Sequence, residues 1–136
     1  MPVRSLSSFV FRWPNARTVD QAVHRWVKQV VQQRQDVVRI GYFGSYARGD
    51  WGVGSDLDLV IVVESSDQPF QRRAAKWDVM ELPVPADVLV YTQREWQSLS
   101  QQGRFYQTAM RETIWVYSRE SKQTEEPMRA VEEVEQ

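Results

Sequence analysis

The sequence predicts an α/β (α+β) protein, built as a small mixed β-sheet with helices packed on one side. Three observations support this prediction. Apolar residues recur at helical spacing early in the chain, short runs of β-branched and aromatic residues end at turn residues, and the two kinds of segment alternate along the sequence. The expected order is helix, strand, turn, strand, helix, strand, helix, strand.

The first helix is expected over residues 18–35. Thr18 stands where it can cap the helix N-terminus. His24 lies off the apolar face, so we expect it to be an exposed surface residue and not a metal ligand. The apolar residues recur every three or four positions and form one stripe: Val19, Ala22, Val23, Trp26, Val27, Val30 and Val31.

Two strands are expected to follow this helix. Residues 37–43 are rich in β-branched and aromatic side chains and stop at Gly44, which is typical of a strand that ends in a turn. Residues 57–64 are apolar almost without interruption, and this continuity favours a central strand.

A second helix is expected to open at Pro69 and to run to about residue 82. Its inner face would carry Phe70, Ala74, Trp77 and Met80. Beyond two further prolines, Thr92 and Glu95 form a capping box, Thr-x-x-Glu. The last elements are a strand over 86–91, a helix from Thr92 to about Gly103, a helical segment over 104–111 and a strand over 113–117.

The chain is expected to form one domain over residues 1–117, followed by a tail over 118–136. Its 136 residues are enough for one core and too few for two of ordinary size. The tail is polar and acidic, so we expect a mobile segment. A weak helical spacing of its apolar residues leaves a docking role open.

Composition limits the chemistry that the chain can perform. No cysteine occurs, which excludes thiol nucleophiles and cysteine-bound zinc, and His24 is the one histidine. A metal must therefore bind oxygen ligands, which favours Mg²⁺ or Mn²⁺. The sequence contains no recognisable signal peptide or membrane-spanning run, so a cytoplasmic protein is expected. A pI of about 5.9 gives no support for direct binding of nucleic acid.

Gly44-Ser45 stands at the end of the first expected strand. A glycine there lets the backbone turn sharply and approach a ligand closely. The N–H groups at the start of the turn can bind an anion such as a phosphate. The same pair is also typical of an ordinary turn.

Three aspartates stand near the starts of two expected strands. Asp56 and Asp58 are two positions apart, so both point to one face, roughly 6.5 Å apart along the strand. They repel each other, and a divalent cation between them would remove that repulsion. The alternative is that Asp56 ends the loop and Asp58 lies at a sheet edge. Asp87 begins the later strand, and if the two strand starts lie together, the acids form a two-metal phosphoryl-transfer site.

The glycine turn and the three aspartates together resemble a known sequence motif. Gly44-Ser45, ten intervening residues, Asp56-x-Asp58 and the later Asp87 resemble the motif of the DNA polymerase β-like nucleotidyltransferase superfamily. The fuller strings, Gly-Ser-Tyr-Ala-Arg-Gly and Ser-Asp-Leu-Asp-Leu, are similar to its small prokaryotic members, the minimal nucleotidyltransferases of the MNT antitoxin type. The resemblance implies the nucleotidyltransferase fold.

The resemblance also implies roles for individual residues. Asp56 and Asp58 would bind two Mg²⁺ ions. Asp87 would bind the catalytic metal and help to deprotonate the acceptor hydroxyl. Gly44 and Ser45 would hold the β- and γ-phosphates of the ATP donor. Arg48 would contact the phosphates, or alternatively form an intramolecular salt bridge.

A partner is implied as well. Small members of this group pair with a HEPN-domain toxin in a hetero-oligomer and transfer AMP to one of its tyrosines, which makes them antitoxins. Two alternatives remain open. One is transfer of a nucleotide to a small molecule such as an aminoglycoside, and the other is an antitoxin that acts by binding alone.

Overall fold

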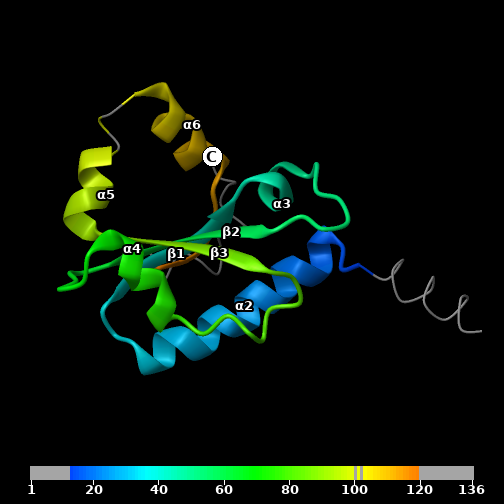
Figure 1. The fold of residues 1–136 in the computed structure, drawn as a ribbon, viewed down its shortest axis with the longest axis horizontal. Coiled ribbons are helices and arrows are strands. Elements are labelled where there is room, and N and C mark those ends of the chain that lie inside the picture. The colour runs from blue at the N-terminus through cyan, green and yellow to red at the C-terminus, as the bar shows by residue number, and fades with distance from the viewer. Residues whose placement is uncertain (1–12, 100, 102, 120–136) are drawn as a thin grey trace, which may run out of the picture.

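The computed structural model describes residues 13–99, 101 and 103–119, and Figure 1 shows its fold. Its centre is a four-stranded sheet in the order β3-β2-β1-β4. β2 pairs antiparallel with β1 and parallel with β3, while β1 also pairs antiparallel with β4. The α/β class, the mixed sheet and the central place of β2 are confirmed.

The order of elements follows the prediction, and each strand boundary agrees with it to within one residue. The tail expected from residue 118 lies almost entirely outside the described residues. No helix in the described part of the chain is long and apolar enough to cross a membrane. The strands are β1 (Val37–Phe43), β2 (Leu57–Val63), β3 (Ala86–Thr92) and β4 (Ile114–Ser118). The helices are α2 (Ala16–Gln33), α3 (Ser45–Arg48), α4 (Phe70–Arg73), the 3₁₀ turn η1 (Ala74–Lys76), α5 (Gln93–Leu99) and α6 (Arg104–Glu112).

Helix α2 begins two residues earlier than the sequence predicted. Asn15, and not Thr18, is the capping residue, because the Asn15 Oδ1 atom accepts a hydrogen bond of 2.8 Å from the Thr18 backbone N–H. This bond satisfies one of the free N–H groups at the helix start. His24 is exposed as expected, and its ring lies 3.5 Å from the Asp20 carboxylate.

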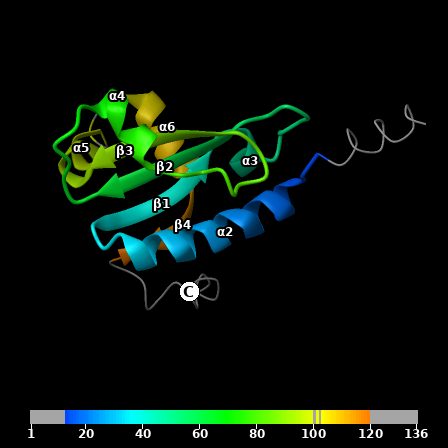
Figure 2. The same cartoon turned by 60° about the horizontal axis from the view of Figure 1, so that its bottom comes forward.

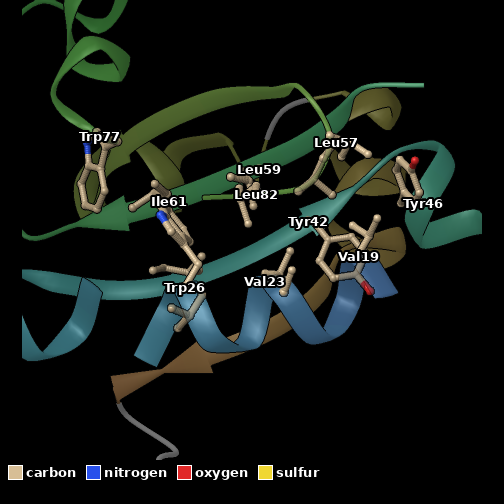
Figure 3. Packing of buried hydrophobic residues seen from close by; sticks show 14 of the residues in the cluster. Val19, Val23, Trp26, Tyr42, Tyr46, Leu57, Leu59, Ile61, Trp77 and Leu82 are labelled. Carbon is tan, nitrogen blue, oxygen red and sulfur yellow. The ribbon is translucent and has the colours of Figure 1, made fainter. Parts of the chain in front are cut away.

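The main core lies between α2 and one face of the sheet (Figure 3). Alternate β2 side chains, Leu57, Leu59 and Ile61, are fully buried there. Val19 and Trp26 of α2 meet them from the helix side. Burying one such side chain contributes about 1.5–3 kcal/mol, so this layer is a main source of the stability of the fold.

The helices flank both faces of the sheet, which differs from the expectation of helices on one side. In Figure 2, α2 lies below the sheet while α5 and α6 lie above it. The physical reason is the continuous apolar character of β2. Its even positions, such as Val60 and Val62, are also buried, so the second face needs a cover of its own.

The second helix is much shorter than predicted. It ends as the η1 turn at Lys76, and Trp77 adopts an extended conformation. This change of direction lets Trp77 reach the core beside α2, where the Trp26 Nε1 atom donates a 2.8 Å hydrogen bond to the Asp78 carbonyl. Met80, which was expected on the inner face, is instead 87% exposed.

The capping box at the start of α5 is confirmed. The Glu95 N–H donates to Thr92 Oγ1 at 3.2 Å, and the Thr92 N–H donates to Glu95 Oε1 at 2.9 Å. Glu95 also accepts two hydrogen bonds from the buried Arg73 guanidinium, at 2.7 and 3.1 Å. These bonds hold the pKa of Glu95 below its ordinary value and tie α4 to α5.

Gly41 permits the close approach of β1 and β4, which gives a test of the sheet. A Cβ atom at this position would lie 2.7 Å from the Ile114 carbonyl oxygen and 2.8 Å from Thr113 Cγ2. We expect Gly41→Ala to lower the free energy of unfolding by about 1–3 kcal/mol, since β4 must move. Gly52→Ala, whose added methyl meets nothing within 4 Å, is the control. Equal urea midpoints for the two variants would contradict this packing.

Candidate active site

Strand pairing brings Asp58 and Asp87 side by side. β2 and β3 run parallel, and Asp58 is the direct partner of Asp87 in their register. On the other side of β2, Asp58 is the partner of Phe43 in the antiparallel pair with β1. Partners in register point to the same face of a sheet. Phe43, Asp58 and Asp87 therefore form one row across three strands, on the face opposite α2.

Gly44 follows β1 directly and turns the chain into α3. Its φ of 79° lies in a region that favours glycine. A Cβ atom on Gly44 would overlap the Asp58 carboxylate, so only a glycine allows this carboxylate to lie against the turn. The sequence predicted a glycine for a close approach to a ligand, and the structure shows a close approach to the acid.

A cavity of about 560 Å³ opens over this row, and we term it the acid cavity. All six residues singled out from the sequence line it: Gly44, Ser45, Arg48, Asp56, Asp58 and Asp87. Its other walls come from Phe43 and Ser55 and from one face of α6, with Thr108, Ala109 and Glu112. The sequence pattern did not identify Glu112, because nothing in the residues around it indicates that α6 folds over the strand starts.

The acids around Asp58 make its ionised form unfavourable. Burial raises the pKa of Asp58, and the neighbouring Asp87 and Asp56 raise it further, while Arg48 acts in the opposite direction. Asp56 and Asp87 themselves are exposed to solvent at the mouth of the cavity. The cavity thus gathers negative charge without a full complement of positive charge.

Arg48 spans part of the acid cavity. Its guanidinium lies 3.1 Å from the Asp50 carboxylate and 3.5 Å from that of Glu112. The pair with Glu112 connects α3 with α6. The intramolecular salt bridge considered from the sequence is therefore present, and the phosphate contact stays a prediction. Beside it, Trp51 stacks on Tyr46 with ring centroids 5.6 Å apart, which holds the loop that leads to Asp56.

The donor chemistry of the cavity fits a divalent cation. Carboxylate oxygens are the ligands that Mg²⁺ prefers, and a cation would relieve the repulsion among the three aspartates. Within the residues that the structure describes, no group of three or more His, Cys, Asp or Glu side chains is arranged to hold a metal ion. The metal-binding roles of Asp56, Asp58 and Asp87 therefore stay a prediction.

The raised pKa of Asp58 predicts a dependence of stability on pH. Asp58 takes up its charge at a lower pH in the unfolded chain, near the ordinary value of 3.8, than in the folded protein. Its contribution to stability is therefore complete below that value and is lost as the pH rises through the folded pKa. We expect Asp58→Asn, in metal-free protein, to raise the melting temperature at pH 7 and to have little effect near pH 3.5. Asp67→Asn, beyond the opposite end of β2, is the control. A constant difference across this range would contradict the charge repulsion.

The contact between Gly44 and Asp58 predicts a coupling between the two positions. Gly44→Ala should destabilise the protein through backbone strain and through overlap with the carboxylate, at about 1–3 kcal/mol for each effect. In an Asp58→Ala background the second cost should disappear. A double-mutant cycle from urea denaturation measures this coupling. Gly49→Ala, at a φ of 91° with nothing within 4 Å of its methyl, should show no coupling to Asp58→Ala.

Comparisons with known proteins agree with the fold. A family model described as a nucleotidyltransferase domain matches residues 24–116. A candidate nucleotidyltransferase from Sulfolobus solfataricus superposes with a TM-score of 0.56 at 18% identity, over 77% of this chain and 85% of that chain. This similarity concerns the fold alone.

A second solved structure, a toxin–antitoxin with AMP-PNP, gives a TM-score of 0.44 at 11% identity, over 80% of this chain and 95% of that chain. Among curated proteins no significant match was found. The family model covers well over half of the sequence, and its residues include the whole acid cavity. This chain belongs to the nucleotidyltransferase domain family.

Proposed function

We propose that this nucleotidyltransferase transfers AMP from ATP to a tyrosine hydroxyl of a HEPN-type toxin, in a Mg²⁺-dependent reaction, and so acts as the antitoxin of a type VII-like pair. Membership of the family supports nucleotidyl transfer. The similarity of the Gly44–Gly49 and Ser55–Leu59 strings to minimal nucleotidyltransferases supports a protein acceptor. The pair would work in the cytoplasm as a hetero-oligomer, without direct binding of nucleic acid.

The observation that carries the proposal is the register of β2 and β3. It sets Asp58 beside Asp87 in the acid cavity, where Asp58 lies directly against the Gly44 turn. Carboxylates at this place could hold the cations that neutralise a phosphoryl group, and the N–H groups of a glycine turn could position it. Positioning and charge neutralisation make up most of the catalysis of this reaction.

The six cavity residues that the sequence singled out then have the following roles. Asp56 and Asp58 would hold two Mg²⁺ ions, and Asp87 would hold the catalytic one and accept the proton of the acceptor hydroxyl. Gly44 and Ser45 position the β- and γ-phosphates, and Arg48 contacts them. The bound metal supplies a lower pKa for the attacking hydroxyl and neutralises charge on the phosphoryl group.

The reaction balances as a single displacement. The acceptor oxygen forms a bond to the α-phosphorus of ATP, and the bond from that phosphorus to the bridging oxygen breaks. The proton of the hydroxyl passes to the Asp87 carboxylate, and the β- and γ-phosphates leave together as pyrophosphate. The acceptor carries AMP at the end of the reaction.

The proposal predicts a transfer that depends on Asp58. With α-³²P-labelled ATP, Mg²⁺ and the protein encoded next to this gene, label should appear on that protein. Asp58→Asn should reduce the rate by about 10³-fold or more, because it removes a ligand charge from the catalytic centre. Asp67→Asn should transfer at the wild-type rate, and EDTA should stop the reaction.

Other outcomes would select other functions. Label on an added aminoglycoside, with none on the neighbouring protein, would favour a small-molecule nucleotidyltransferase. Toxin neutralisation that survives Asp58→Asn would contradict catalysis and leave an antitoxin that acts by binding.

A further inference from the structure

A second cavity, of about 140 Å³, lies between the sheet and helices α5 and α6. Its walls are apolar and aromatic, and we term it the aromatic cavity. Leu89 of β3 and Met110 of α6 face it from opposite sides. Tyr91, Trp96 and Tyr106 supply three aromatic rings.

The aromatic cavity continues the acid cavity along the same face of the sheet. Val60 and Leu89 are partners in the register of β2 and β3, and they stand two residues beyond Asp58 and Asp87. Side chains two residues apart on a strand share a face and lie about 6.6 Å apart. The second cavity therefore begins one row of side chains away from the carboxylates.

The two cavities also share walls. Phe43 at the end of β1 and Ala109 on α6 line both of them. A ligand whose charged end lies over Asp58 would extend past Phe43 and Ala109 to reach the aromatic rings. The two residues common to both cavities carry no charge.

The size of the second cavity suits a flat ring. An apolar cavity of about 150 Å³ takes up benzene and otherwise stays dry. Protein interiors are normally close-packed, so a space of this size in the second layer is unfavourable when nothing fills it. Aromatic walls add stacking, which is the usual way in which proteins hold nucleobases without reading their sequence.

We propose that the aromatic cavity binds the nucleobase of the donor nucleotide while its phosphates occupy the acid cavity. This inference rests on the proposed function, since it assumes a nucleoside triphosphate donor. One ribose separates the base from the α-phosphate, so the base must lie within a short reach of Asp58 and Asp87. The aromatic cavity lies within that reach. The acceptor side chain is not covalently linked to the phosphates before the reaction, so its position is not limited in this way.

The polar groups of the aromatic cavity can form hydrogen bonds with the edge of a nucleobase. A tyrosine hydroxyl is protonated at neutral pH, so that of Tyr91 is a possible donor to a ring nitrogen; burial, Tyr106 and Glu95 raise its pKa above the ordinary value. The Thr113 hydroxyl is already engaged, because it donates to the Ala109 carbonyl at 2.7 Å. A few polar groups in an apolar wall are typical of small-molecule sites.

Filling the cavity tests the proposal. Met110→Trp adds an indole to the aromatic cavity and replaces no residue that lines the acid cavity. Met80→Trp makes the same exchange at a side chain that is 87% exposed and lines neither cavity. Isothermal titration calorimetry in Mg²⁺ compares ATP with tripolyphosphate, which has the phosphates and no base.

We expect Met110→Trp to weaken ATP binding by roughly 5- to 100-fold, the range of one lost base stack, and to leave tripolyphosphate binding unchanged. Met80→Trp should bind both as the wild type does. Leu89→Trp fills the cavity from the strand side and should behave like Met110→Trp. It replaces that variant if circular dichroism shows that Met110→Trp is unfolded.

Three results would overturn the inference. Wild-type affinity for ATP in a folded cavity-filling variant would show that the base lies elsewhere. Intact ATP binding with loss of AMP transfer would assign the cavity to the acceptor. If wild-type protein bound neither ATP nor tripolyphosphate, the donor site itself, and with it the proposed function, would fail.

Discussion

The parallel pairing of β2 with β3 is the constraint on which the site depends. A parallel pair places the starts of both strands at one edge of the sheet, and the observed register makes Asp58 the neighbour of Asp87. Antiparallel pairing would have sent Asp87 toward the far end of β2. Both strands are anchored on their other face by α2, whose side chains pack against the alternate residues Leu57, Leu59 and Ile61. The main core and the acidic side chains therefore lie on opposite faces of the same strands.

The close carboxylates of the acid cavity lower the stability of the folded protein. Four carboxylates line this cavity. Burial and the charges of Asp87 and Asp56 raise the pKa of Asp58. Gly44 approaches that carboxylate so closely that no other residue type fits. Local departures from the rules of stable packing are typical of functional sites, because the geometry that serves a ligand differs from the geometry that stabilises the empty protein.

Helix α6 connects the two cavities of the second face. Its residues line both of them, and the ion pair of Glu112 with Arg48 joins it to α3. At the other edge, Arg73 binds Glu95 and the Val90 carbonyl, which ties α4 and α5 to β3. These polar contacts fix helices α4, α5 and α6 on the second face of the sheet, whereas apolar packing fixes α2 on the first.

The sequence by itself determined the strands, the first helix and the six cavity residues, because these depend on local patterns. The continuous apolar run of β2, the glycine after β1 and the Thr92–Glu95 capping box can be recognised in a few neighbouring residues. Four things were decided by the tertiary structure. The cover on both faces follows from the sheet position of β2, and the early end of the second helix follows from the place of Trp77 in the core. Glu112 joins the site, and the aromatic cavity exists, because α6 folds over strands far away in sequence. Contacts between distant segments leave no local pattern, and this is the physical reason why the sequence could indicate the acids and not the walls around them.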